Sequence, residues 1–356
     1  MPTNYIKGRG AQKNVANRFF ELSHTLDNDF LDYCHKENEA PTNNKTQFQE
    51  VFPKSIVNKV KSPDVGMTYS LNPYQGCEHG CIYCYARNSH EYWGYSAGLD
   101  FEQKILVKKN AAKLLENKIN SKSWKATPIV LSGNTDCYQL IEKKLNLTRS
   151  CLQVFLNYKH PVAIITKNAL ITRDLDILKA LAKDNLIRVN ISVTSLNEET
   201  RRLLEPRTAS IKLRLKTIKT LTEANIPVNV MMAPIIPGIN SHEILPLVKK
   251  VSEVGATSVG YTLVRLNGAI ADIFSDWIKK TMPNKAEKVL HQIADCHNGS
   301  LHNSQYGQRM RGNGVFAKQI ADLFKIAQNK YLSNKEIKPL NNNLFEQFKT
   351  GQYKLF

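Results

Sequence analysis

Three cysteines lie close together in the sequence, in the run Cys77-Glu-His-Gly-Cys81-Ile-Tyr-Cys84. Because the chain has only seven cysteines in 356 residues, a C-x3-C-x2-C pattern would arise by chance in roughly three such chains per thousand. Thiolates are the soft ligands of iron–sulfur clusters and of zinc, and a tight loop brings three neighbouring sulfurs to one point. The spacing therefore indicates a metal site.

Two kinds of metal site remain open, an iron–sulfur cluster and a structural zinc. A structural zinc takes four protein ligands, and no paired C-x2-C or H-x3-H partner occurs elsewhere in the chain. A four-iron cluster held by three thiolates keeps one iron free to bind a substrate. The remaining cysteines each stand alone: Cys34, Cys137, Cys151 and Cys296. The total of seven cysteines is odd and their spacing is uneven, which argues against a secreted disulfide framework.

The residues around the three cysteines resemble the cluster loop of radical S-adenosylmethionine (SAM) enzymes. The match runs from Asn72 to Arg87 and includes an aromatic residue, Tyr83, before the last cysteine. The resemblance implies that Cys77, Cys81 and Cys84 hold a 4Fe-4S cluster and that S-adenosylmethionine binds its open iron. An electron would then cleave this cofactor to a 5′-deoxyadenosyl radical. It also implies that Tyr83 holds the adenine and that a ferredoxin- or flavodoxin-type protein supplies the electron.

Further motifs are similar to the spore photoproduct lyase-like branch of this family. They are Asn-Pro-Tyr-Gln-Gly-Cys and Cys-Tyr-Ala-Arg in the cluster run, Ser132–Gln139, and Leu204–Ser210. The resemblance covers roughly residues 55–325 and implies a cofactor pocket lined by Thr135, Asp136, Lys167, Ser192 and Ala233. For Lys167 and Ser192 the alternative is an ordinary polar residue at a strand end. Ser-Gly-Asn-Thr-Asp replaces the Gly-Gly-Glu usual after the second strand, so the group that binds the methionine amino group is not indicated.

Cys137 directly follows Asp136, at the expected mouth of the fold. Thiol S–H bonds are weak, and the photoproduct lyases have a cysteine near this strand that gives hydrogen to the product radical. The resemblance therefore implies that Cys137 is a catalytic hydrogen donor. Its position is shifted relative to the cysteine of the photoproduct lyases, so that here the thiol follows the aspartate. The alternative is a small buried residue, which is the commonest environment of a free cysteine. Cys151, in the apolar run Ser-Cys-Leu-Gln-Val-Phe-Leu, is expected to pack in the core.

Six short apolar runs alternate with helical patterns and would position these residues. The runs are Met67–Leu71, Pro128–Leu131, Val162–Thr166, Leu186–Val193, Val228–Met232 and Ser258–Val264. From the second onward they begin about 25 to 40 residues apart, which fits parallel strands joined by returning helices. Six units are too few for a closed eight-stranded barrel. We therefore expect an α/β fold, an open partial (β/α)6 barrel with its site at the carboxyl ends of the strands, and the resemblance implies that this barrel is of the radical SAM type.

Helix starts and composition suggest the remaining organisation. Asp100, Thr172 and Asn197 are candidate N-caps of helices that follow strands. Residues 1–62 are expected to form an N-terminal extension that is partly loop, with an Asn-rich loop at 36–45. Residues 63–270 would form the core, and 271–356 a helical region with a polar tail that docks or stays free.

The charge balance suggests a polyanionic partner. The chain has 49 basic and 31 acidic residues, a net charge of +18, which favours DNA or RNA. Seven basic residues and one acid, Glu205, lie between Arg201 and Lys219. The nearby aromatics Tyr92, Trp93 and Tyr95 could stack on bases, or the segment could be a solvated helix face. The segments 7–10 and 309–314 are further basic candidates.

The sequence also limits the class of protein. Its 42% apolar and 22% charged residues are typical of a globular chain. No window approaches the roughly 18 apolar residues of a membrane span, and the first twenty residues lack a signal-peptide run, so we expect a cytoplasmic protein. We expect a radical SAM enzyme acting on nucleic acid, in repair or base modification. The alternatives are a protein or small-metabolite substrate, or a nucleic-acid-binding protein whose cluster is structural or redox-sensing. Oligomeric state is not indicated.

Overall fold

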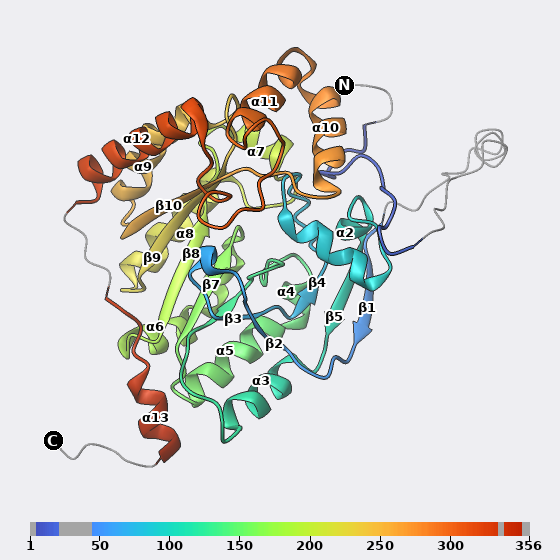
Figure 1. The fold of residues 1–356 in the computed structure, drawn as a ribbon. Helices are drawn as coiled ribbons and strands as arrows, with labels where there is room; N and C mark the ends of the chain where they lie inside the picture. Colours follow the sequence, from blue (N-terminus) through green and yellow to red (C-terminus); the bar gives the residue numbers. More distant parts are fainter. Residues whose placement is uncertain (1–4, 21–44, 334–337, 351–356) are drawn as a thin grey trace.

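The computed structural model describes residues 5–20, 45–333 and 338–350. Its centre is a seven-stranded sheet in the order β10-β9-β8-β7-β6-β3-β2 (Figure 1). The strands are β2 (Val57–Lys59), β3 (Tyr69–Leu71), β6 (Ile129–Leu131), β7 (Val162–Thr166), β8 (Ile187–Ser192), β9 (Val228–Ile235) and β10 (Ser258–Leu263). All are parallel except β2, which pairs antiparallel with β3. The edge strands β2 and β10 do not pair, so the prediction of an open barrel with six parallel strands is confirmed.

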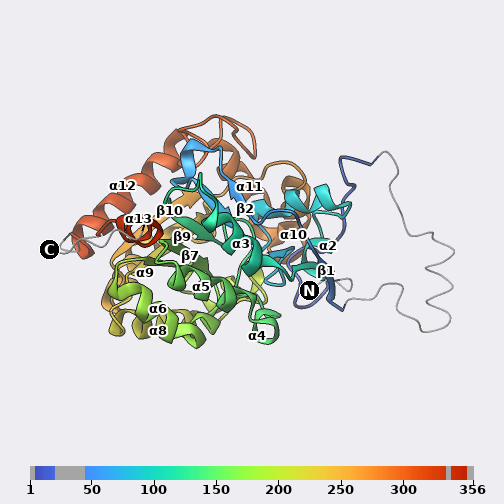
Figure 2. The ribbon, with the colours of Figure 1, turned by 90° about the horizontal axis from the view of Figure 1, so that it is seen from below.

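Helices return the chain between the parallel strands and cover one face of the sheet (Figure 2). They include α3 (Ala111–Asn120), α5 (Leu147–Asn157), α6 (Leu175–Lys183), α8 (Ile211–Glu223) and α9 (Ile244–Glu253). Because side chains alternate along a strand, Val189 and Ile191 of β8 pack in the main apolar cluster with helix residues such as Leu221. Asn190, on the opposite face, accepts a hydrogen bond of 2.8 Å from Asn229 of β9. This pair places polar side chains on the inner face of the partial barrel.

Two predicted helix starts differ from the structure. Asp100 begins only a single turn, α2 (Asp100–Gln103), before strand β5 (Lys104–Lys108). This strand lies between β1 (Gln47–Val51) and β4 (Tyr74–Gln75) in a second, three-stranded sheet, and that pairing overrides the helical pattern. The cap predicted at Thr172 is instead Asn168, whose side chain accepts from the amide of Leu170 at the start of the 3-10 helix η3 (Ala169–Asp174). The Asn197 cap of α7 (Glu198–Leu204) is confirmed, because its side chain accepts from the Thr200 amide.

The N-terminal extension contributes strands to both sheets, since β1 and β2 both precede residue 62. The expected Asn-rich loop at 36–45 lies outside the described residues except for Lys45. Short helices complete the core: η1 (Pro63–Val65), η2 (Tyr85–Trp93), α4 (Glu142–Leu145) and η4 (Ser241–Glu243). The domain boundaries themselves stay predictions.

The C-terminal region is helical, as expected. It contains α10 (Ile270–Thr281), α11 (Pro283–Asp295), α12 (Gly314–Tyr331) and α13 (Asn343–Thr350). The part of the tail that the structure describes is docked: Phe345 of α13 is buried against His160, with ring centroids 5.0 Å apart, and Glu346 accepts a 2.8 Å hydrogen bond from the Ala126 amide. None of the helices in the described ranges is long and apolar enough to cross a membrane.

The loop between α11 and α12 bridges the two edges of the open sheet. On the β10 side, the Leu263 amide donates to the Met310 carbonyl at 2.9 Å. On the other side, the Arg309 guanidinium and the Gly307 amide bind the Asp64 carboxylate of η1 at 2.7 and 3.0 Å. Asp64 lies shortly before β3, so this bridging loop, residues 301–312, spans the opening that the sheet leaves.

Candidate active site

The three cysteines lie on a tight loop that follows β4. Cys77 and Cys81 are buried, Cys84 is partly buried, and all three are free thiols. The Cys77 amide donates to the Phe101 carbonyl at 2.8 Å and the Cys84 amide to the Cys81 carbonyl at 3.3 Å. Gly80 adopts φ +66°, and a Cβ there would lie 2.7 Å from a carboxylate oxygen of Glu102. Only glycine fits this turn, which keeps the loop compact.

Three thiols on one loop are the ligand set of a four-iron cluster with one open iron. Within the described ranges, no three His, Cys, Asp or Glu side chains converge on a position for one ion, as a zinc site requires. In a four-iron cluster each cysteine binds a different iron, so the sulfurs lie further apart. Burial raises the pKa of the Cys81 thiol well above its usual value, while the nearby Lys167 ammonium acts in the opposite direction. Lys167 thus places positive charge where anionic thiolates would sit.

Asp136, after β6, joins the cluster loop to the strand ends. Its carboxylate accepts hydrogen bonds of 2.8 Å from the Thr166 hydroxyl and the Lys167 amide and of 2.9 Å from the Tyr138 amide. His79 of the cluster loop lies 3.3 Å away. Burial would raise the pKa of Asp136, but His79 and these hydrogen bonds lower it to about 2. Burial would lower the pKa of His79, but Asp136 and Cys77 together raise it to about 10. The two therefore form a buried ion pair.

The other predicted pocket residues lie at neighbouring strand ends. Thr135 donates through its hydroxyl to the Tyr74 carbonyl at 2.8 Å. Ser192 is buried at the end of β8, and Lys167, after β7, and Ala233, in β9, are partly buried. The structure thus brings all of them to the carboxyl end of the sheet, and their contacts with S-adenosylmethionine stay predictions.

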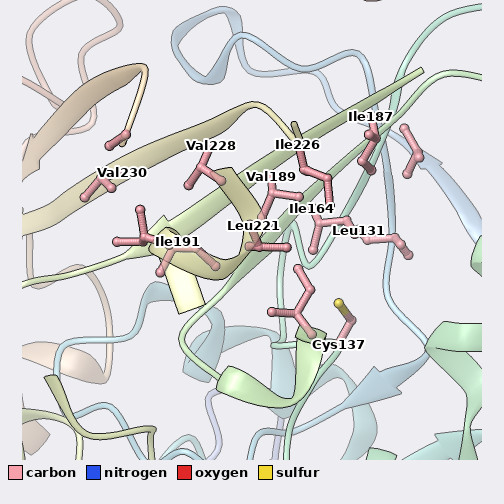
Figure 3. Packing of buried hydrophobic residues seen from close by; sticks show 14 of the residues in the cluster. Leu131, Cys137, Ile164, Ile187, Val189, Ile191, Leu221, Ile226, Val228 and Val230 are labelled. Atoms are coloured by element: carbon pink, nitrogen blue, oxygen red, sulfur yellow. The ribbon is translucent and has the colours of Figure 1, made fainter. Parts of the chain in front are cut away.

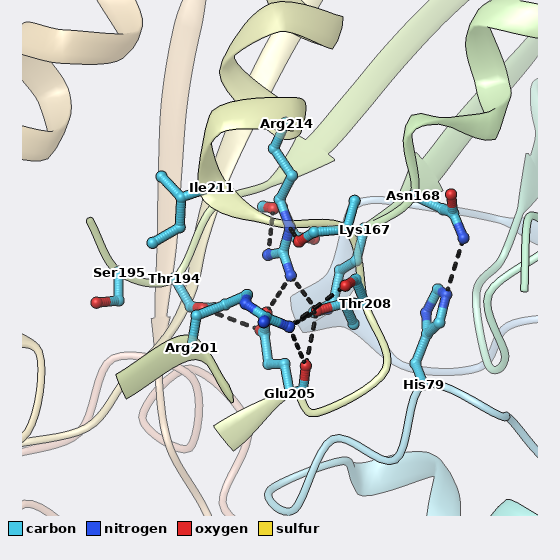
Figure 4. Close-up of polar contacts among 12 residues, drawn as sticks. His79, Lys167, Asn168, Thr194, Ser195, Arg201, Glu205, Thr208, Ile211 and Arg214 are labelled. Carbon is cyan, nitrogen blue, oxygen red and sulfur yellow. Dashed lines mark hydrogen bonds and ion pairs between the residues drawn. The ribbon is translucent and has the colours of Figure 1, made fainter. Parts of the chain in front are cut away.

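Glu205 of the motif Leu204–Ser210 joins Tyr83 of the cluster loop to Thr194, which follows β8; its contacts with Thr194 and Arg214 are drawn in Figure 4. Its fully buried carboxylate pairs with Arg214 at 2.5 Å and accepts from the hydroxyls of Thr194, at 2.9 Å, and Tyr83. Burial would raise the pKa of Glu205, but Arg214, the Lys167 ammonium and the Tyr83 hydrogen bond hold it at about 2. The phenol of Tyr83 is therefore anchored to an anion, which fixes its ring beside the last cysteine.

The predicted basic face is wrong at two positions. Arg201 and Arg214 are only 6% and 1% exposed, because each is consumed by an internal ion pair, Arg201 with Glu198 at 2.7 Å and Arg214 with Glu205. Four cations of the segment do face solvent: Arg202, Lys212, Lys216 and Lys219. The other two basic candidates, segments 7–10 and 309–314, also present less positive charge to solvent, because Arg9 is buried and Arg309 pairs with Asp64. The exposed positive charge of the segment from Arg201 to Lys219 therefore lies on α7 and α8.

Cys137 lies inside the main apolar cluster, not at the surface of the mouth. It is fully buried and shares this cluster with Leu131 and Ile164 (Figure 3). Its amide donates to the Ser132 hydroxyl at 2.7 Å and its carbonyl accepts from Thr148 at 2.6 Å. Burial raises the pKa of its thiol well above the usual value. This environment favours the packing alternative, and the hydrogen-donor role stays a prediction.

The two roles of Cys137 predict different results for Cys137→Ala. Loss of a packed sulfur is expected to lower the free energy of unfolding by about 1 to 2 kcal/mol and to leave the reaction products unchanged. Anaerobic denaturant unfolding combined with product analysis measures both quantities. New side products at unchanged cluster content would instead support the hydrogen-donor role.

Comparisons with known proteins agree with this geometry. The family model of the radical SAM superfamily matches residues 71–251. An uncharacterized protein of Mycobacterium tuberculosis is 31% identical over 247 residues, 68% of this chain and 73% of that protein. One of Methanocaldococcus jannaschii is 28% identical over 253 residues, 71% of this chain and 90% of that protein.

A solved structure has the same fold. Spore photoproduct lyase with bound AdoMet and dinucleoside spore photoproduct superposes with a TM-score of 0.61 at 13% identity, over 88% of this chain and 94% of that one. At this identity the likeness concerns the fold alone. The family match includes the cluster loop and all strand ends up to β9. This chain therefore belongs to the radical SAM superfamily.

Proposed function

We propose that this radical SAM enzyme acts on a nucleic acid, as a repair lyase or in base modification. Enzymes of this superfamily use a 4Fe-4S cluster and S-adenosylmethionine, and Cys77, Cys81 and Cys84 would hold the cluster. When bound, these cofactors supply a 5′-deoxyadenosyl radical that abstracts hydrogen from the substrate. We infer that a ferredoxin- or flavodoxin-type protein supplies the electron, in the cytoplasm, where thiols are kept reduced.

The chain's own residues would prepare the pocket for these cofactors. Buried Tyr83 and Thr135 exclude water from the cluster loop. Asp136 holds the loop on the strand ends through His79. Lys167 offers a cation to thiolates or to a carboxylate, and Ser192 and Ala233 form the pocket wall at β8 and β9. These roles belong to the proposal.

One observation carries the choice of substrate: an exposed aromatic patch beside the cluster loop. The patch consists of Arg18, Phe19, Phe20, Tyr92 and Trp93, and its four rings are 42% to 72% exposed. The rings of Phe19 and Tyr92 lie 4.8 Å apart, and the Arg18 guanidinium lies 4.8 Å from the Phe19 ring. Tyr92 and Trp93 end η2, the helix that begins directly after Cys84. Single-stranded nucleic acids bind such surfaces by stacking their bases on rings and on arginine planes.

Two further observations support this substrate class. The net charge of +18 favours binding to phosphates. The structurally similar lyase is described with a dinucleoside photoproduct, which suggests both a nucleic-acid substrate and a lyase-type reaction. Tyr95, which the sequence grouped with Tyr92 and Trp93, is not part of the patch, since its hydroxyl donates to Gln49 and its ring packs on His90.

Binding of a single-stranded oligonucleotide tests the proposal. The logarithm of the affinity is expected to fall linearly with the logarithm of salt concentration, by about 0.7 per phosphate contacted. Trp93→Ala is expected to weaken binding by about 1 to 3 kcal/mol through the loss of one stacked base. Fluorescence anisotropy over a salt series measures both effects. A flat salt response, as expected for a metabolite substrate, would remove the proposal.

Two control variants assign the binding to the patch. Phe348→Ala changes a ring of similar exposure, 41% against 42% for Trp93, on α13, which lies across the molecule from α2 (Figures 1 and 2). The patch residues Tyr92 and Trp93 belong to η2, which packs against α2. Phe348 is therefore far from the patch, and its substitution should leave binding unchanged. Replacing Arg202, Lys212 and Lys216 together by Gln tests the basic face. Equal binding by that triple variant would assign these three cations to solvation alone.

A further inference from the structure

The N-terminal segment Arg9–Gln12 lies against the back of the cluster loop. The carboxylate of Glu102, fully buried in α2, accepts hydrogen bonds from the Gly10 amide at 3.0 Å and the Ala11 amide at 2.8 Å. The Arg9 guanidinium donates to the Glu102 backbone carbonyl at 2.9 Å. Since an unsatisfied buried carboxylate is costly, Glu102 depends on this segment for two of its donors.

Glu102 is connected in turn to the cluster cysteines. Its carboxylate pairs with Arg87 at 2.5 Å, and both side chains are fully buried. Arg87 donates to the Cys81 carbonyl at 3.0 Å. The residue before Glu102, Phe101, accepts the 2.8 Å hydrogen bond from the Cys77 amide. Two of the three cluster cysteines are therefore held by groups that meet at Glu102.

Two glycines allow this close approach. A Cβ on Gly10 would lie 1.8 Å from the carbonyl oxygen of Gly80, which is far inside van der Waals contact. Gly80 is the glycine between Cys77 and Cys81, and its own missing Cβ leaves room for the Glu102 carboxylate. The N-terminal backbone, the Glu102 carboxylate and the cluster loop thus pack without a side chain between them.

We propose that Arg9–Gln12 is a positioning element of the cluster site. It completes the hydrogen bonds of Glu102, and Glu102 with Arg87 holds the backbone of Cys81 in place. The cluster loop thereby has its binding conformation before a cluster binds, and the segment keeps the loop in that conformation afterwards. This role is independent of the substrate, so a failure of the nucleic-acid proposal leaves it standing.

Gly10→Ala in the full chain tests the role. Because overpacking at a backbone contact displaces the segment, iron release from reconstituted protein to a chelator is expected to be about tenfold faster than in the wild type. Amide hydrogen exchange of the apo protein is expected to be faster over residues 77–84. Ala16→Val is the matched control, since it adds bulk to an exposed residue four positions after the segment and should change neither rate.

A second variant covers the case in which Gly10→Ala yields too little folded protein. Arg9→Gln removes the hydrogen bond to the Glu102 carbonyl but leaves the glycine contact intact, so an intermediate increase in both rates is expected. Unchanged iron release and unchanged exchange in both variants would overturn the proposal. An equal acceleration of exchange in α6 and α9, remote from the segment, would also overturn it, because it would show general destabilisation rather than positioning.

Discussion

Replacing Cys81 by alanine is expected to abolish both cluster binding and the reductive cleavage of S-adenosylmethionine. Anaerobically reconstituted wild-type protein should contain about four irons and four sulfides per chain. With only two thiolates left on the loop the cluster loses a ligand. Iron and sulfide analysis and the yield of 5′-deoxyadenosine after dithionite reduction measure the loss. Alanine at Cys77 or Cys84 should act alike.

Cys151→Ala is the matched control for this result. Cys151 is also a buried free thiol, but it packs in the apolar cluster on α5. Its removal should leave iron, sulfide and cofactor cleavage unchanged. Full cluster content in Cys81→Ala would contradict the assignment of the ligands. Zinc without sulfide in the anaerobically purified wild type would contradict the cluster itself.

Glu205→Ala is expected to cause a large loss of stability, although Glu205 lies outside the apolar core. It leaves the Arg214 guanidinium, which is 1% exposed, buried without its counter-charge, and such a loss typically costs about 3 to 5 kcal/mol. It also frees the Tyr83 phenol beside the cluster loop. Denaturant unfolding of the apo protein measures the energy. Replacing the pair together, by Glu205→Leu and Arg214→Met, should restore most of the stability.

The dependence of the free energy of unfolding on pH in the acid range gives a second measurement of the contribution of Glu205. Its pKa is about 2 in the folded protein, below its ordinary value of 4.5. A group with a depressed folded pKa stabilises the fold above its unfolded pKa, and this contribution is lost as pH falls from 4.5 towards 2. Glu205→Gln should flatten the stability profile in that interval.

An exposed carboxylate serves as the control for Glu205. Glu223, at 65% exposure, pairs with Lys219 on the surface of α8. Its substitution by alanine should change the free energy of unfolding by less than about 1 kcal/mol. A similarly small change for Glu205→Ala would contradict the role of its buried ion pair.

The strands were predictable from sequence because each parallel strand is a short apolar run with a helix-length interval after it. β5 was missed because Lys104–Lys108 follows a strong capping signal at Asp100, and only pairing with β1 and β4 makes it a strand. That pairing involves residues far apart in the chain, so no local pattern contains it. The same reason explains why β1 was not distinguished from the surrounding polar extension.

The cluster cysteines were predictable because their ligand chemistry depends on local spacing. The supporting ion pairs were not, since Glu205 is 122 positions from Tyr83 and Gly10 is 92 from Glu102. One signal was available: Arg214 lies on the same helical face as Ile211, Ile218 and Leu221, which are all buried. A cation on an apolar face requires a buried acid. The count of charged residues between Arg201 and Lys219 did not assign each residue to a face of the helix, so it did not reveal the need for a buried acid.

The bridging loop at 301–312 has a consequence for biosynthesis. The contact between Arg309 and Asp64 joins residues 245 positions apart, and contacts this distant in sequence form late. At about 5 to 20 residues per second, the ribosome needs about 12 to 50 seconds to add the residues between them. During that interval the nascent chain has its cysteine loop but lacks the segment that spans the two sheet edges. The opening between the two sheet edges is therefore spanned only after residue 309 has been synthesised, and a chain released before that residue would lack this contact.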